Sequence, residues 1–258
     1  MNNRHFKPIV QLGLFVVGLF FLVACSENGS SDSSVNGGSS GQGGSTARFT
    51  IQNDHLIVVE ASSIVVYSLQ TPNDPLEVYR TYTSDGELET IFPYQENLLF
   101  IGSQNGSIIL ELSESGELIE IASISHARSC DPVVANDTQM FVTIRTGSGC
   151  WGSTVSNRLM AYDISDLTNP IRIANIVIDQ PIGLGLQGTS LFVCYSDGLI
   201  EYDVTESVPE QINDYIGVSC NDLIPDGESL VLTSNRSINQ VIADSGILTE
   251  LSEISAGD

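Results

Sequence analysis

Positive charge is the scarcest feature of this 258-residue sequence, which has nine Lys and Arg against 32 Asp and Glu. Two of the nine, Arg4 and Lys7, lie in the first 25 residues, where there is no carboxylate. The rest of the chain therefore has seven arginines, no lysine and a formal net charge of −25. Such an acidic surface repels phosphate groups, which excludes binding to nucleic acid or to anionic lipid headgroups. The charge is more typical of a role in solubility than of a dedicated cation site.

Helical periodicity is also missing, because no stretch after residue 25 repeats apolar residues at helical spacing. Two familiar chemical signatures are absent as well. No Cys-x-x-Cys pair is present, and Ser148 and Ser153 lie in Gly-rich sequence without the Gly-x-Ser-x-Gly motif of hydrolases. These absences argue against a helical domain, a thiolate metal centre and a serine nucleophile elbow.

What the chain does have is a repeat of roughly 40 residues. Its clearest copy is Ser190–Val204, SLFVCYSDGLIEYDV, which predicts a strand, a turn at Asp197-Gly198 and a second strand. The first apolar residue of that strand defines five anchor positions: Leu56, Leu99, Met140, Leu191 and Leu230. In the third copy, an insertion near Arg145–Val155 separates the anchor from its matching Tyr162.

Each copy contains about four short apolar runs bounded by Gly, Asn, Asp or Pro, which are typical of strands. Runs such as Leu98–Ile101 are apolar throughout, as expected for a sheet covered on both faces. Four strands per period predict an all-β fold, a β-propeller of about five four-stranded blades. We place the blades near residues 47–84, 85–125, 126–179, 180–218 and 219–255. Alternatively, Arg48–Asn53 completes the last blade and closes the ring.

The turn after the third strand of each blade carries a recognisable pattern. Tyr162–Pro170, YDISDLTNP, resembles the repeat of the LVIVD family of bacterial β-propellers, and Tyr67–Pro75 and Tyr202–Thr205 match parts of it. In physical terms, Asp and Ser cap the turn that leaves the strand, and Asn-Pro sets an extended backbone before the next strand. The resemblance covers roughly Arg48–Ser255 and implies surface or periplasmic interaction roles more than a shared enzymatic activity.

The N-terminus predicts export and a lipid anchor. Arg4 and Lys7 precede the apolar run Ile9–Val23, as in a signal peptide of residues 1–24. The ending Leu22-Val23-Ala24-Cys25 resembles a bacterial lipobox, which implies cleavage before Cys25 and its lipidation. Ser26 after that cysteine favours the outer membrane. The alternative is an ordinary signal peptide or membrane anchor with an incidental cysteine.

A linker separates this anchor from the propeller, which we assign to residues 47–258. Ser26–Thr46 consists almost wholly of Ser, Gly and small polar residues and predicts a flexible coil. The lipidated Cys25 and this linker together form the segment 25–46, so the folded body is expected at a distance from the membrane.

Four further cysteines favour disulfides, since their number is even in an exported chain. In the repeat, Cys130 and Cys220 both open an innermost strand, on the propeller face where Cys150 and the end of the strand carrying Cys194 are expected. We therefore predict the pairs Cys130–Cys150 and Cys194–Cys220. A thiolate metal site and free thiols are the alternatives.

The same face is where we expect ligands, near the mouth of the central channel. Trp151, the only Trp, lies on the inserted loop, where it either contacts a ligand or packs over the neighbouring disulfide. The carboxylates of this face are suited to bind Ca²⁺, to act as an acid/base pair on glycosides, or simply to remain solvated in turns, and we predict no cofactor or resident metal. The candidate ligand-binding residues are Glu89, Arg128, Asp131, Trp151, Asn221 and Asp222.

We therefore expect a lipid-anchored envelope protein whose propeller is a binding or scaffold module for a protein or polysaccharide, rather than an enzyme. A carbohydrate-active hydrolase that uses the channel-mouth carboxylates is the second hypothesis. A purely structural envelope protein is the third.

Overall fold

Every element of regular structure in the described part of the chain is a β-strand. The computed structural model describes residues 43–71, 73, 76–82, 87–125, 132–145 and 157–255. These residues form twenty strands, and among them there is no helix that could cross a membrane. The predicted signal peptide and Cys25 lie outside the described residues.

The strands form five sheets of four, and each sheet uses consecutive strands of one predicted blade. Blade 1 contains β1 (Phe49–Gln52), β2 (His55–Val59), β3 (Ser63–Ser68) and β4 (Leu76–Tyr82). Blade 2 contains β5 (Leu88–Tyr94), β6 (Leu98–Ser103), β7 (Gly106–Leu112) and β8 (Leu118–Ser125). Blade 3 contains β9 (Val133–Ala135), β10 (Gln139–Ile144), β11 (Arg158–Asp163) and β12 (Ile171–Val177). Blade 4 contains β13 (Leu184–Gln187), β14 (Ser190–Tyr195), β15 (Gly198–Asp203) and β16 (Glu210–Ile216). Blade 5 contains β17 (Asp222–Asp226), β18 (Ser229–Thr233), β19 (Ser237–Asp244) and β20 (Ile247–Ser255).

The strand register confirms the repeat. Every anchor, on the second strand of its blade, is paired directly with the residue of the third strand that occupies the position of Tyr162 in its own copy of the repeat, and we call this its matched residue. A β-bulge between the third and fourth strands occurs just before that matched residue in every blade. The pairs are Leu56–Tyr67, Leu99–Leu110, Met140–Tyr162, Leu191–Tyr202 and Leu230–Val241.

The turn that follows the third strand is capped as the sequence predicts. The Asp163 carboxylate accepts a hydrogen bond from the backbone N of Ser165 at 2.9 Å, and Asp203 accepts one from Thr205 Oγ1 at 2.7 Å. These bonds hold the pKa values of both carboxyl groups below their usual range. The Asp of the motif therefore has a local structural role in both turns.

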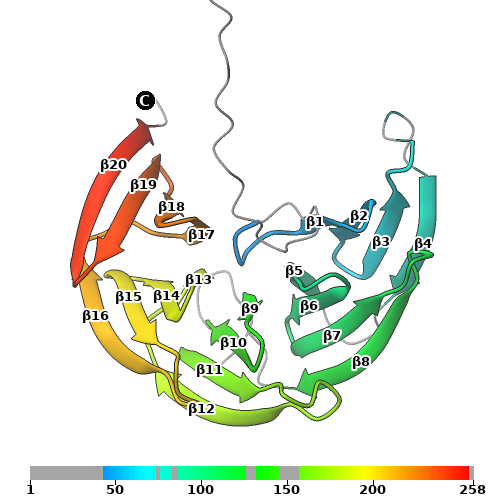
Figure 1. The fold of residues 1–258 in the computed structure, drawn as a ribbon, viewed down its shortest axis with the longest axis horizontal. Helices are drawn as coiled ribbons and strands as arrows, with labels where there is room; N and C mark the ends of the chain where they lie inside the picture. The colour runs from blue at the N-terminus through cyan, green and yellow to red at the C-terminus, as the bar shows by residue number, and fades with distance from the viewer. Residues whose placement is uncertain are drawn as a thin grey trace, which may run out of the picture. The chain divides into compact units, whose positions relative to one another are not determined.

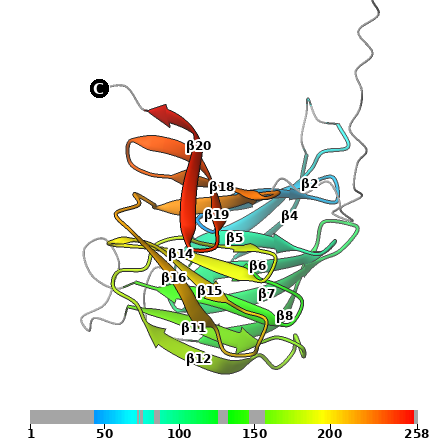
Figure 2. The same ribbon diagram turned by 60° about the vertical axis from the view of Figure 1, so that its left-hand side comes forward.

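The blades pack face to face around a common centre, with β1, β5, β9, β13 and β17 innermost (Figures 1 and 2). One apolar cluster lies between each pair of consecutive blades. Strands β6 and β10 are buried along their whole length, as the uninterrupted apolar runs predict. Burial on both faces explains why these strands lack the apolar/polar alternation of a half-exposed sheet.

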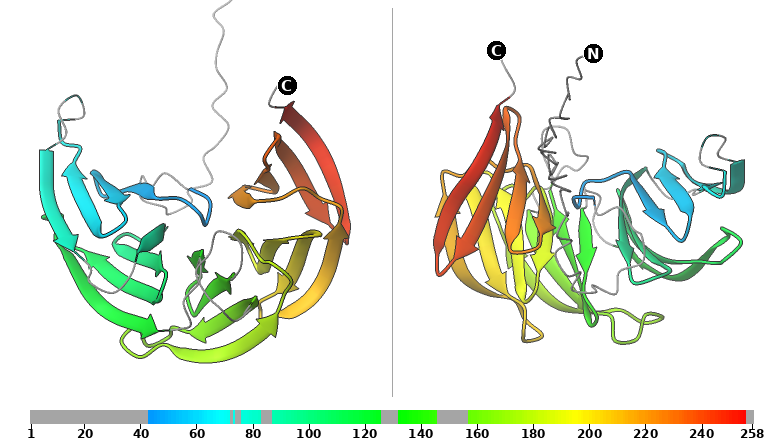
Figure 3. Two further views of the ribbon diagram at one scale, coloured as in Figure 1. Left: turned by 180° about the vertical axis from the view of Figure 1, so that it is seen from behind. Right: turned by 45° about the horizontal axis from the view of Figure 1, so that its top comes forward.

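Blades 1 and 5 are the two ends of the series (Figure 3). β1 pairs with β2 from Phe49 to Gln52, so the segment Arg48–Asn53 belongs to blade 1 and does not complete blade 5. The two end blades are instead linked through the chain that leads into β1. Ala47 O accepts a hydrogen bond from Ile91 N of blade 2 at 2.9 Å, which fixes the start of this chain against the centre.

Candidate functional site

The segment Gly43–Thr46 is bound to the inner edges of blades 4 and 5. Ser45 Oγ donates to Asp222 Oδ1 at 2.9 Å, and Thr46 donates to Asp222 Oδ2 through its N at 3.1 Å and its Oγ1 at 2.6 Å. Leu184 N of blade 4 donates to Ser45 Oγ at 2.8 Å. We assigned these residues to the flexible linker, but the side chains of Ser45 and Thr46 are part of the folded body, because Asp222 offers two acceptor oxygens to them.

Asp222 is buried, with 8% of its surface exposed. Besides Ser45 and Thr46, its carboxylate accepts a hydrogen bond from Leu223 N at 3.0 Å. A buried carboxylate needs such donors, since an unpaired charge in the interior is costly. The carboxylate of Asp222, which we predicted to bind a ligand, thus accepts hydrogen bonds from other residues of the protein itself.

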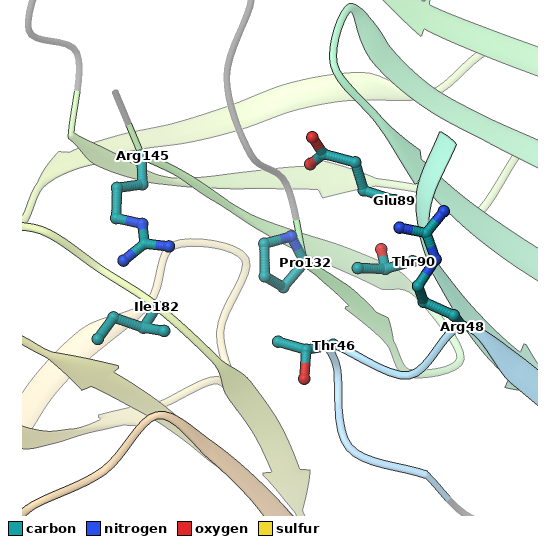
Figure 4. A pocket seen from close by; sticks show the side chains of 7 residues that line it. All are labelled: Thr46, Arg48, Glu89, Thr90, Pro132, Arg145 and Ile182. Carbon is teal, nitrogen blue, oxygen red and sulfur yellow. The ribbon is translucent and has the colours of Figure 1, made fainter. Parts of the chain in front are cut away.

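A pocket of about 240 Å³ opens beside this segment, at the centre of the blades (Figure 4). Six residues of its wall come from the inner ends of blades 1 to 4 or the loops beside them, and Thr46 comes from the N-terminal segment. The lining residues are Thr46, Arg48, Glu89, Thr90, Pro132, Arg145 and Ile182.

Two arginines face the pocket from different blades. Arg48 lies beside Glu89 on one side, and Arg145 lies on the other side, with Pro132 between them (Figure 4). Arg48 is held in place by backbone carbonyls, since its Nη2 donates to Leu88 O at 3.0 Å and its Nε to Val59 O at 3.4 Å. In a chain with seven arginines after residue 25, two guanidinium groups at one pocket are a local positive site on an acidic protein.

The remaining wall combines polar and apolar side chains. Thr46 and Thr90 supply hydroxyl groups, while Pro132 and Ile182 supply apolar surface. A guanidinium group binds a carboxylate or phosphate through two parallel hydrogen bonds, and hydroxyl groups bind sugar hydroxyls. The pocket is therefore suited to a small ligand that has hydroxyl groups and one acidic group.

Of the predicted site residues, Glu89 lies in this pocket and Asp222 lies behind it. Asn221 is outside it, where its Nδ2 donates to Asn235 Oδ1 at 2.8 Å. Arg128, Asp131 and Trp151 lie outside the described residues. Within the described part of the chain, no group of three or more His, Cys, Asp or Glu is arranged to hold a metal ion.

The residues that the sequence did not reveal are Thr46, Arg48, Thr90, Pro132, Arg145 and Ile182. The scarcity of basic residues was the available signal, because Arg48 and Arg145 occur at the inner ends of their blades in an otherwise acidic chain. From the sequence we named these two arginines only as ends of segments, such as Arg48–Asn53 and Arg145–Val155.

One predicted disulfide is present on the same side of the molecule as the pocket loops. Cys194 of β14 is bonded to Cys220, which precedes β17, with their Cα atoms 5.3 Å apart. This bond ties blade 4 to blade 5, as predicted. The predicted partners Cys130 and Cys150 lie outside the described residues.

No protein-family model and no curated protein sequence matches the chain. The LVIVD resemblance and the lipobox thus stay predictions. Several solved structures share the fold at low sequence identity. A protein from Lactobacillus plantarum is 12% identical with a TM-score of 0.65, over 78% of this chain and 68% of that chain. The periplasmic gluconolactonase PpgL of Pseudomonas aeruginosa is 13% identical with a TM-score of 0.62, over 79% of this chain and 68% of that chain. BamB from Moraxella catarrhalis is 10% identical with a TM-score of 0.50, over 80% of this chain and 62% of that chain.

These structures are β-propellers, and the five four-stranded sheets place the present chain in the same class of fold. At such identities the likeness establishes the architecture alone, because unrelated functions recur on one fold.

Proposed function

We propose that this β-propeller is a binding protein of the bacterial cell envelope, and that its central pocket holds an acidic sugar unit, free or within a polysaccharide. The observation that carries the proposal is the pair Arg48 and Arg145 on the two sides of the pocket. A uronate residue has one carboxylate for a guanidinium group and hydroxyl groups for Thr46 and Thr90.

The net charge limits the ligand further. A chain of formal charge −23 repels a strongly anionic partner at long range and slows its association. A ligand with a single carboxylate, or a polysaccharide with widely spaced ones, avoids most of that repulsion while retaining the contact with Arg145. The proposal therefore favours sparsely charged saccharides over densely charged ones.

Isothermal titration calorimetry with D-glucuronate tests this, with D-glucose as the uncharged comparison. Replacing Arg145 by Gln removes one charge-assisted contact and is expected to weaken glucuronate binding about 10-fold or more. The matched control is Arg172→Gln, which makes the same charge change at an exposed position on β12. Equal effects of the two variants, or equal binding of glucose and glucuronate, would contradict the proposed site.

A second candidate, lactone hydrolysis, is favoured by Glu89 in the same pocket. In this reaction Glu89 would take a proton from water as the water attacks the lactone carbonyl, and would return it to the ring oxygen as the ring C–O bond breaks, while the guanidinium groups would stabilise the developing oxyanion. The gluconolactonase among the similar structures motivates the substrate class. A glycosidase would need a second carboxylate, and Glu89 is the one carboxylate among the described residues that line the pocket.

The two candidates differ in their response to Glu89→Gln. With D-glucono-1,5-lactone in a pH-stat assay, a hydrolase loses turnover in this variant while glucuronate binding persists. A binding protein shows no turnover above the spontaneous rate in either form. If the parent neither binds nor hydrolyses any acidic sugar tested, a purely structural envelope role becomes the better explanation.

The proposed location rests on the N-terminal sequence alone. A lipidated Cys25 would hold the propeller at the outer membrane, and the Ser/Gly-rich segment before Gly43 would let it reach ligands away from the surface. A polysaccharide of the envelope or its surroundings would then be available to the central pocket.

A further inference from the structure

The contact between consecutive blades uses the same residue positions four times. The residue after each anchor points toward the next blade and is at most 1% exposed in blades 1 to 4, as Ile57, Phe100, Phe141 and Phe192. We call this side of a blade its forward face. The anchor itself lies on the opposite side, the backward face, and is fully buried in blades 2 to 5.

Blade 5 has the same forward face without a blade to cover it. The position of Leu199 in blade 4, which is fully buried, is occupied in blade 5 by Ile238, which is 46% exposed. The position of Tyr215, 7% exposed, is occupied by Ile254, 70% exposed. Ile238 and Ile254 are thus apolar residues at positions that are buried in blade 4 and exposed to solvent in blade 5.

The middle of the forward face of blade 5 is uncharged. Directly paired residues share a face of a sheet, which assigns these residues from the observed register. Strands β18, β19 and β20 place on it Val231, Thr233, Ile238, Gln240, Ile242, Asp244, Ile247, Thr249, Ser252 and Ile254. Asp244, the last residue of β19, is the one charged side chain in this set, and Asp222 and Asp226 of β17 lie on the same face nearer the centre.

Blade 4 shows how the fold treats a polar group at this interface. Glu201, 8% exposed, accepts hydrogen bonds from Ser190 Oγ at 2.8 Å, Asn213 Nδ2 at 2.7 Å and Tyr215 OH at 2.8 Å. In blade 5 the equivalent residue is the neutral Gln240, whose Nε2 donates to Ser229 Oγ at 3.0 Å. Burying an uncharged amide that already has an internal hydrogen-bond partner costs less desolvation free energy than burying a carboxylate. The Gln240 position is therefore compatible with burial under another sheet.

Blade 1 presents the complementary half of the interface. Its anchor Leu56 is partly exposed, whereas the other four anchors are buried. On the same backward face, Phe49 is 62% exposed and Ile51 is 37% exposed. The two free faces thus belong to the two ends of the blade series, whose inner edges are joined by Ser45 and Asp222.

We propose that these two faces receive a β-sheet segment of a second polypeptide, roughly 40 residues long and apolar on both sides, which packs between them as a further blade. The evidence is continuity with an interface that the chain already forms four times. A sheet that is apolar on both sides is unstable alone in water, so this partner segment folds as it docks.

Other occupants fit less well. Each end blade of a second copy of this chain is already covered on one side by its own neighbour. A second copy can therefore cover one of the two faces at a time, but it cannot pack between them as a further blade. The printed sequence before Gly43 contains the Ser/Gly-rich linker and the leader, neither of which has the pattern of four strands. Direct packing of blade 1 against blade 5 would bury both faces within one chain. The test must therefore distinguish this closure from docking of a partner segment.

The first measurement is the fluorescence of bis-ANS, a dye that binds exposed apolar surface. Ile238→Glu combined with Ile254→Glu is expected to lower the dye signal about twofold, because it places charge on the free face. The control pair, Val177→Glu with Ile216→Glu, changes residues that are each 76% exposed on β12 and β16 and is expected to have little effect. Equal effects, or a parent that binds no dye, would mean that the face is already covered and would overturn the proposal.

The second measurement supplies a blade as the probe. A copy of residues 180–218, which form a blade apolar on both sides, is fused after Asp258 through a Gly/Ser linker. We expect the fusion to lower the dye signal and raise the melting temperature in the parent, and to do neither in the Ile238→Glu, Ile254→Glu background. Sedimentation velocity must show both proteins to be monomeric. A fusion that leaves the dye signal unchanged in the parent would refute docking of a blade at these faces.

Discussion

Ser45 and Asp222 are 177 residues apart in the sequence, yet the Ser45 hydroxyl donates a hydrogen bond of 2.9 Å to the Asp222 carboxylate in the interior of the protein. The same carboxylate accepts two bonds from Thr46, a residue that lines the central pocket. The contact therefore joins the first described residues to the last blade and also positions one wall of the candidate site.

Replacing Asp222 by Ala is expected to lower the free energy of unfolding by roughly 3 kcal/mol, because the buried hydroxyl of Ser45 and the two donors of Thr46 lose a charged acceptor. Urea unfolding followed by circular dichroism measures this. The control is Asp226→Ala, which removes an exposed carboxylate from the same strand. A loss as small as that of the control would contradict a structural role for Asp222.

A second variant tests the same contact without changing any charge. A Cβ added at Gly44 would lie 2.1 Å from Asp222 Oδ2, so Gly44→Ala must displace the carboxylate or the segment. We expect Gly44→Ala to reduce stability and also to weaken ligand binding, since Thr46 and Arg48 follow directly in the chain. Wild-type affinity in a folded Gly44→Ala protein would show that the segment does not position the pocket.

The Cys194–Cys220 disulfide closes a loop with a sequence separation of 26 residues. Replacing both cysteines by Ala is expected to cost about 3 kcal/mol, by restoring conformational freedom to the unfolded chain. Thermal unfolding of the variant and the oxidised parent gives the difference. Peptide mapping without reduction then tests the other predicted pair, Cys130–Cys150, and a cross-paired map would contradict both assignments.

Alkaline pH is expected to destabilise the protein through its buried tyrosines. Burial, together with the neighbouring Asp214, raises the pKa of Tyr195 and of Tyr202 to about 12 each. In the unfolded chain these phenols ionise near pH 10, so the unfolded state loses its protons first, and stability falls as pH rises from about 10 toward 12.

Tyr195→Phe provides the comparison. It removes the bond that Tyr195 OH donates to Asp214 at 2.8 Å, so the variant should be about 1 kcal/mol less stable at pH 8. Because it also removes one ionising group, its urea midpoint should decline less steeply than that of the parent above pH 10. Parallel declines would show that Tyr195 does not contribute to the alkaline transition.

The lipid anchor is tested by mass spectrometry of the N-terminal peptide from the membrane fraction. We expect a peptide that begins at Cys25 and carries acyl chains, with residues 1–24 absent. Cys25→Ala should abolish the modification and prevent this cleavage. An unmodified Cys25, or a parent that keeps its leader, would replace the lipid anchor by an ordinary signal peptide or membrane anchor.

Much of the fold follows from the sequence, because the repeat consists of hairpins whose pairing depends on residues that are close together in the chain. Pairing of an anchor such as Leu191 with Tyr202 requires only a hairpin of fixed length, and the Asp197-Gly198 turn sets that length. Uninterrupted apolar strands such as Leu98–Ile101 report burial on both faces, which requires a stack of sheets. The bulge before each matched residue has no sequence signal that we recognised.

The candidate site depended on contacts between distant segments. Glu89 was predicted from its place at the end of an inner strand, but Arg48 and Arg145 converge on it only through the packing of three blades. Asp222 has the sequence features of a ligand-binding carboxylate and instead accepts hydrogen bonds from Ser45 and Thr46. Composition alone does not reveal such a partner, since it lies at the other end of the chain.

The sequence by itself determined the strands, their grouping into blades and the Cys194–Cys220 pair, because a period of roughly 40 residues encodes hairpins and their order. Only the tertiary structure decided that the N-terminal segment reaches Asp222, that two arginines share one pocket, and that blades 1 and 5 each have exposed apolar side chains on one face. These features depend on how sheets pack at the centre and at the ends of the series, where neighbouring residues in space are not neighbours in sequence.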